Sequence, residues 1–150
     1  MAPPTQKTKI LVVDDELEMR VFLSRVLETA GYHPILAHNG LEGLKKAVRE
    51  QPDLIILDVM VDRQGCLEMF DDLKVDDALN KIPVVMLSTI DQKTLFHLHP
   101  PLMPGLANDC RPEGFLIKPP EAEELLGLLR SLTGESRTGS TEVERDADWG

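Results

Sequence analysis

Short apolar runs alternate along this chain with longer stretches whose apolar residues recur at helical spacing. Runs of consecutive apolar residues indicate strands that bury both faces, as in a parallel sheet covered by helices on both sides. Strand and helix in alternation predict an α/β domain with right-handed crossovers. The predicted strands are residues 9–13, 34–37, 54–57, 83–87 and 114–117.

Four amphipathic stretches predict the helices. Gly31 and the pair Gln51 and Pro52 are expected to end the first two. A polar gap at Asp76 and Asp77 interrupts the third. The apolar positions are Met19, Phe22, Leu23, Val26, Leu27 and Ala30, then Leu41, Leu44, Ala47 and Val48, then Leu67, Phe70, Leu73 and Leu79, and finally Leu125, Leu128, Leu129 and Leu132.

Residues 91–113 break this regular pattern, because they are rich in proline and have no clear period. Asp91 can cap a helix there, but Pro100 and Pro101 would end it after about two turns. We therefore expect an irregular or shortened fourth helix followed by an ordered loop.

Composition and charge limit the possible number of domains, the classes of function and the location of the protein. The chain has 150 residues and a net charge of -10, with 26 acidic against 16 basic residues. One domain is expected at this length, and the acidity argues against a surface that binds nucleic acid. Two cysteines are too few for a disulfide framework, and no apolar run suits a signal peptide or a membrane span. We expect a cytoplasmic protein with a disordered lead at 1–8, one domain at 9–133 and a disordered tail at 134–150. A tail of this length is too short to form an output domain.

The candidate chemistry lies where the predicted strands end. Asp14 and Asp15 follow the first strand, Asp58 the third, Ser88 the fourth and Lys118 the fifth. Parallel strands bring these groups to one edge of the sheet, where α/β folds place ligand sites. Clustered carboxylates suit Mg²⁺, and aspartate can act as a nucleophile in phosphoryl transfer. Taken singly, these residues also have ordinary alternatives, such as a helix cap, a strand-end hydroxyl and a surface lysine.

Four motifs in order resemble response-regulator receiver domains, the CheY-like modules of two-component signalling. They are ILVVDDE at 10–16, LDVM at 57–60, PVVMLS at 83–88 and FLIKP at 115–119, and the resemblance covers residues 8–132. It implies a flavodoxin-like, doubly wound sheet with strand order 2-1-3-4-5. It also implies a partner histidine kinase or phosphotransfer protein, a downstream protein target, and no enzyme activity beyond self-catalysed phosphorylation and dephosphorylation.

The resemblance assigns the site residues. Asp58 matches the phosphoacceptor, and Ser88 with Lys118 matches the pair that binds the phosphoryl group. Phe115 matches an aromatic switch residue. The remaining implied features are the Mg²⁺ ligands Asp14, Asp15, Asp58 and the backbone carbonyl of Met60, and a cis peptide bond between Lys118 and Pro119.

The chain departs from the family pattern in ways that keep two alternatives open. The loop at 61–65 lacks the usual proline and is one residue short, Thr89 replaces the usual alanine, and the span from Ser88 to Lys118 is long. A receiver-like binding module that works without phosphate is one alternative. An Asp-nucleophile phosphohydrolase is the other, although the Asp-x-Asp motif typical of that class is missing.

Two apolar residues are expected beside the acceptor by family geometry, Met60 and Ile90. Neither can orient an attacking water, and both could shield a phosphoryl group from one. The sequence therefore predicts slow self-dephosphorylation, which polar residues at these two positions should accelerate.

Overall fold

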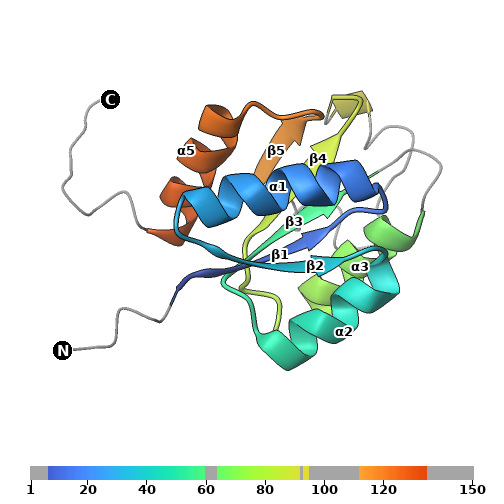
Figure 1. Cartoon of the computed structure of the whole chain (residues 1–150). Coiled ribbons are helices and arrows are strands. Elements are labelled where there is room, and N and C mark those ends of the chain that lie inside the picture. The colour runs from blue at the N-terminus through green and yellow to red at the C-terminus, as the bar shows by residue number, and fades with distance from the viewer. Residues whose placement is uncertain (1–6, 60–63, 92, 95–111, 135–150) are drawn as a thin grey trace, which may run out of the picture.

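The computed structural model describes residues 7–59, 64–91, 93–94 and 112–134 (Figure 1). Five parallel strands form one sheet in the order β2-β1-β3-β4-β5, which confirms the predicted class and topology. The strands are β1 (Lys9–Val13), β2 (His33–Ala37), β3 (Leu54–Asp58), β4 (Val84–Ser88) and β5 (Gly114–Ile117). The helices are α1 (Leu17–Thr29), α2 (Gly40–Glu50), α3 (Gln64–Val75) and α5 (Ala122–Thr133).

Helices cover both faces of the sheet, α1 and α5 on one side and α2 and α3 on the other (Figure 1). Alternate strand residues point to opposite faces, so β1 sends Ile10 and Val12 toward α1 and α5 and Leu11 and Val13 toward α2 and α3. β3 and β4 alternate in the same way. Apart from Lys9, Asp58 and Ser88 at their ends, the three central strands are apolar because each remaining residue enters one of two cores.

The ends of two helices differ from the expectation. Asn39 does more than turn the chain, since its side chain caps α2 by accepting a hydrogen bond from the Glu42 N–H at 2.8 Å. α3 ends at Val75 and does not extend to Leu79. The Asp76 carboxylate accepts hydrogen bonds from the Ala78 and Leu79 N–H groups at 2.7 and 3.1 Å and holds a turn there. Leu79 nevertheless reaches the core.

The predictions for three segments lie mostly outside the described residues. Asp91 accepts a hydrogen bond from the Thr94 N–H at 2.7 Å, as a helix cap would. Residues 95–111, where the shortened helix and loop were predicted, are not described. The same holds for 1–6 of the lead and 135–150 of the tail. No helix within the described part of the chain is long and apolar enough to cross a membrane.

Candidate functional site

The carboxyl edge of the sheet brings the predicted strand-end residues together. Asp58 and Ser88 end neighbouring strands, β3 and β4. Asp14 follows β1, and its N–H donates to the Ala37 carbonyl at 3.1 Å, so sheet pairing continues one residue further. Lys118 follows β5, and its N–H donates to the Ser88 carbonyl at 2.7 Å. These backbone hydrogen bonds hold the four residues at one place.

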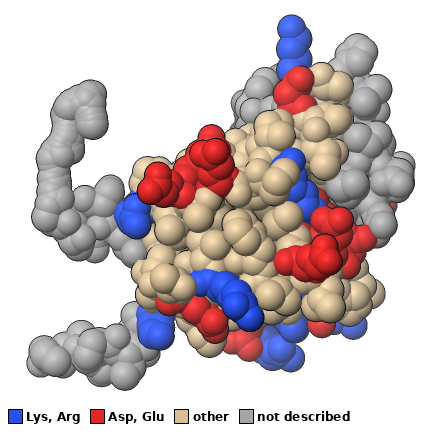
Figure 2. Space-filling view, turned by 45° about the horizontal axis from the view of Figure 1, so that its top comes forward, with Lys and Arg blue, Asp and Glu red and all other residues tan. Residues whose placement is uncertain are grey.

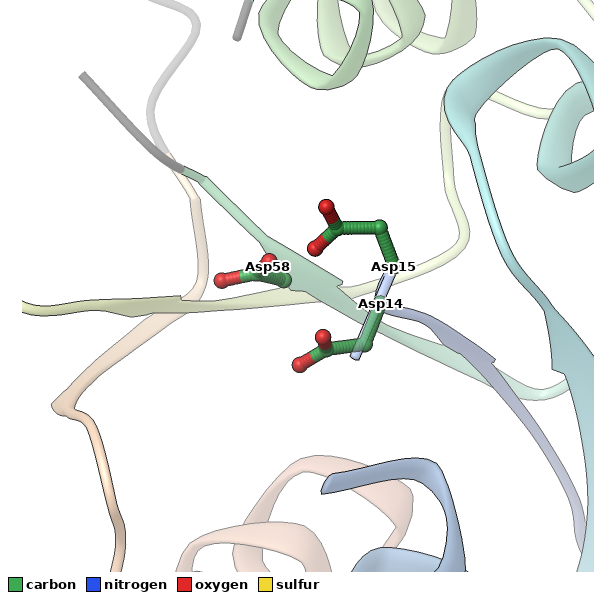
Figure 3. A group of neighbouring side chains, drawn as sticks. All are labelled: Asp14, Asp15 and Asp58. Carbon is green, nitrogen blue, oxygen red and sulfur yellow. The ribbon is translucent and has the colours of Figure 1, made fainter. Parts of the chain in front are cut away.

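Three carboxylates converge beyond the ends of β1 and β3 (Figure 3). Asp14, Asp15 and Asp58 each present an oxygen, and these oxygens lie within 4.8 Å of one another. Asp14 and Asp58 are buried, whereas Asp15 is exposed. The site is therefore a partly buried acidic pocket with one open side.

Among the described residues, Lys118 is the lysine that contacts these carboxylates. Lys118 is buried, and its Nζ lies 3.0 Å from Asp58 Oδ1, 3.0 Å from Asp14 Oδ2 and 2.7 Å from Glu16 Oε1. One positive charge thus faces three contacting carboxylates and a fourth, Asp15, close by. Among the described residues, the carboxylates of the pocket therefore outnumber the lysine that contacts them.

Burial, with the neighbouring charges as a smaller cause, shifts the pKa values of the pocket. Burial raises the pKa of the Asp58 carboxyl to about 6, the Asp14 charge adds to the rise, and Lys118 opposes it. Burial also raises the pKa of Asp14, against the hydrogen bond from the Glu16 N–H and the Lys118 charge. Burial by itself lowers the pKa of Lys118, but its close contacts with the carboxylates of Glu16, Asp14 and Asp58 reverse this and raise the pKa above its ordinary value.

The acidic pocket suits a hard divalent cation. Three carboxylates supply the oxygen ligands that Mg²⁺ prefers. Asp14 Oδ2 is buried and accepts no hydrogen bond, although the Lys118 ammonium lies near it out of alignment. A buried carboxylate oxygen without a hydrogen bond is costly, and a bound cation would remove that cost. The predicted contribution of the Met60 carbonyl lies outside the described residues.

The other predicted residues occupy the surroundings of the pocket. Ser88 is fully buried, and its Oγ accepts a hydrogen bond from the Ile90 N–H at 3.1 Å. Phe115 and Ile90 are half-buried and pack against the core on the side of α2 and α3. Thr89 is exposed. The peptide bond between Lys118 and Pro119 is cis, which confirms the prediction.

Two residues of the site were not predicted from the sequence. Glu16 contacts Lys118, and the Arg20 guanidinium donates to the Asp14 carbonyl at 2.7 Å, which fixes the chain where β1 ends. The acidic run of Asp14, Asp15 and Glu16 was visible, but spacing alone does not reveal which of its side chains reaches the fifth strand.

Charge is mixed over the face in Figure 2, where basic side chains form separate groups among acidic ones.

The comparisons with known proteins agree with this geometry. Residues 10–130 match the family model described as the response regulator receiver domain. The chain is 33% identical to the response regulator MprA of Mycobacterium ulcerans over 135 residues, which cover 90% of this chain and 54% of MprA. It is 38% identical over 87 residues to the polar-differentiation response regulator DivK of Brucella anthropi, covering 58% of this chain and 70% of DivK. Several of the curated relatives that it matches are about twice as long as the matched region.

A solved structure shows the same fold. The chemotaxis response regulator CheY4 of Vibrio cholerae superposes with a TM-score of 0.70 at 29% identity, covering 85% of this chain and 99% of CheY4. Family model, relatives and structure thus point to signalling modules and not to a class of hydrolases. The chain belongs to the response regulator receiver domain family, the phosphoacceptor modules of two-component systems that take phosphate from histidine kinases.

Proposed function

We propose that Asp58 is the phosphoacceptor of this receiver domain. The observation that carries the proposal is the convergence on Asp58, at the end of β3, of Asp14 and Asp15 from the end of β1 and Lys118 from the end of β5. Asp58 is the member of this group at the end of the central strand β3, with the Lys118 ammonium 3.0 Å from its Oδ1. A buried carboxylate beside both a cation and a candidate metal site is suited to receive a phosphoryl group.

Asp14, Asp15 and Asp58 would hold Mg²⁺, together with the backbone carbonyl of Met60 expected from the family. When bound, Mg²⁺ supplies positive charge that offsets the carboxylates and the phosphoryl oxygens. The unsatisfied Asp14 Oδ2 and the excess negative charge of the pocket support this assignment.

The side chains around Asp58 would then have separate roles in phosphoryl transfer. A carboxylate oxygen of Asp58 forms the new P–O bond while the P–N bond of a donor phosphohistidine breaks, and the leaving imidazole keeps the electron pair. The Ser88 hydroxyl and the Lys118 ammonium would bind oxygens of the transferred group. Positioning and charge stabilisation of this kind account for most of the catalysis in phosphoryl transfer, so self-catalysed phosphorylation is expected.

The partners follow from this role. A histidine kinase or phosphotransfer protein would donate the phosphoryl group, and a downstream protein would read the phosphorylated state through direct contact. Phe115, half-buried beside β4, is the proposed switch residue. We place the receiver at residues 9–133, and we include in this proposal the cytoplasmic location expected from the sequence. The family match does not favour a module that works without phosphate.

Intact mass spectrometry of the protein incubated with Mg²⁺ and a small acyl phosphate tests the proposal. We expect the mass of one phosphoryl group to be added, and we expect this addition to be lost when Mg²⁺ is chelated and in Asp58→Asn. Asp77→Asn is a matched control, because Asp77 is exposed beyond α3. Labelling of Asp58→Asn at the level of the parent would show that another residue accepts the phosphate.

A further inference from the structure

We propose that Glu16 is a positioning residue that holds Lys118 in the unphosphorylated protein and competes with the phosphoryl group for it. Glu16 would thereby set how readily the receiver enters its phosphorylated state. The proposal rests on the proposed function of Asp58 and adds a residue to which no role in the reaction was assigned.

The contact between Glu16 and Lys118 is the shortest that the lysine makes with a carboxylate. Nζ lies 2.7 Å from Glu16 Oε1, compared with 3.0 Å from both Asp14 Oδ2 and Asp58 Oδ1. An ammonium group has only three N–H donors, and three carboxylates already surround it at 3.0 Å or less in this state. An oxygen of a phosphoryl group on Asp58 can gain Lys118 only if one of these contacts weakens.

Exposure indicates which contact weakens. The Glu16 side chain is 61% exposed, whereas those of Asp14 and Asp58 are 1% and 3% exposed. A released Glu16 carboxylate regains its hydration, whereas a buried carboxylate that lost the lysine could not be hydrated in its place. Glu16 is therefore the partner that Lys118 can leave at the lowest cost.

The backbone around Glu16 confines this change to its side chain. The Glu16 N–H donates to Asp14 Oδ1 at 2.8 Å, and the Glu16 carbonyl accepts a hydrogen bond from the Arg20 N–H at 3.0 Å. Both bonds fix the start of α1 whatever the carboxylate does. Release of Lys118 by the Glu16 carboxylate breaks neither of these backbone hydrogen bonds.

Beryllofluoride, a phosphoryl mimic, tests the competition when titrated with Mg²⁺ into Glu16→Gln, which keeps the size of the side chain but removes its charge. We expect binding about twofold to fivefold tighter than in the parent, the range that an exposed ion pair allows. Glu18→Gln is the matched control, since it removes the same charge from an exposed position in the first turn of α1. An equal effect in both variants would mean that net charge alone is responsible and would overturn the proposal.

The NMR signals of the Lys118 side chain in lysine-labelled protein give a second readout, which a general change in stability would not produce. Without ligand, Glu16→Gln should shift the Lys118 Cε signal and Glu18→Gln should not. With beryllofluoride bound, the parent and Glu16→Gln should give the same Lys118 signal, because the contact has already been released. A difference that persists in the bound state would show that Glu16 keeps Lys118 and would refute the competition.

The two proposals fail in different ways. If the parent itself does not bind beryllofluoride in the presence of Mg²⁺, the phosphoacceptor role of the site is wrong, and the role of Glu16 is lost with it. If the parent binds but Glu16→Gln behaves like the parent, only the competition by Glu16 is wrong.

Discussion

At the scale of single residues, the described part of the pocket holds more carboxylates than the one lysine that contacts them can balance. Asp14 and Asp58 are both buried, and the pKa of each is raised even though Lys118 contacts both. Burial therefore outweighs the ion pairs in the protein without bound metal. Burial of these two carboxylates, which suit a cation and a phosphoryl group, therefore lowers the free energy of unfolding.

This cost predicts a pH-dependent difference between the parent and Asp58→Asn. The pKa of Asp58 is raised to about 6 on folding, so the folded protein holds a proton that the unfolded chain has lost between about pH 4 and pH 6. The stability of the parent should fall as pH rises through this window, whereas the amide of the variant does not titrate. We expect Asp58→Asn to gain about 2 kcal/mol relative to the parent between about pH 4.5 and pH 7.5.

Urea denaturation of both proteins with a metal chelator present measures this gain. Asp77→Asn serves as control, because it makes the same substitution at an exposed position outside the pocket. Added Mg²⁺ should narrow the gap at the higher pH by stabilising the parent. A gap of constant size across the pH range would mean that the charge of Asp58 is not the cause of the destabilisation.

At the scale of elements, α2 approaches β1 and α3 closely at Gly43. A Cβ atom at this position would lie 2.7 Å from Val13 Cγ2 and 2.9 Å from Met69 Sδ. The methionine side chain can move aside, but a valine in a central strand is rigid. The position of α2 relative to the strand that leads into Asp14 therefore depends on a residue without a side chain.

Gly43→Ala is expected to destabilise the fold by about 1–3 kcal/mol through overpacking, although alanine is the better helix former. Gly127→Ala is the matched control in α5, because a Cβ there meets no atom within 4 Å. It should stabilise by up to about 1 kcal/mol. Thermal or urea unfolding of the two variants compares them, and a Gly43→Ala protein as stable as the parent would show that α2 can shift freely.

The elements also show what the sequence could and could not predict. The strands were predicted well because consecutive apolar residues leave few alternatives to burial on both faces, and parallel strands then bring Asp58 and Lys118 to one edge. The sequence left open whether α3 reaches Leu79, because apolar spacing does not reveal that the Asp76 carboxylate accepts the hydrogen bond of the Leu79 N–H. The contact of Glu16 with Lys118 depends on side-chain rotamers across the site, which sequence spacing does not encode.

At the scale of the whole molecule, the segment between β4 and β5 connects the two sides of the proposed switch. It begins just after Ser88, which is buried at the pocket, and ends just before Phe115, which packs against the core beside β4. The Lys118 N–H also donates a hydrogen bond to the Ser88 carbonyl at 2.7 Å. Movement of Ser88 or Lys118 toward a phosphoryl group would therefore act on both ends of residues 91–113.

We predict that phosphorylation changes hydrogen exchange in residues 91–113 more than in any other part of the chain. A segment whose two ends adjoin the switch residues can respond as one unit, while the central strands are fixed by two apolar cores. Exchange measured with and without beryllofluoride and Mg²⁺ tests this, and Asp58→Asn should show no ligand-dependent change. If 91–113 exchanges identically in both states while the exposed face of α1 or α2 responds, the downstream protein must read that other face. If the mimic binds and no segment responds, the conformational signal proposed for this receiver is wrong.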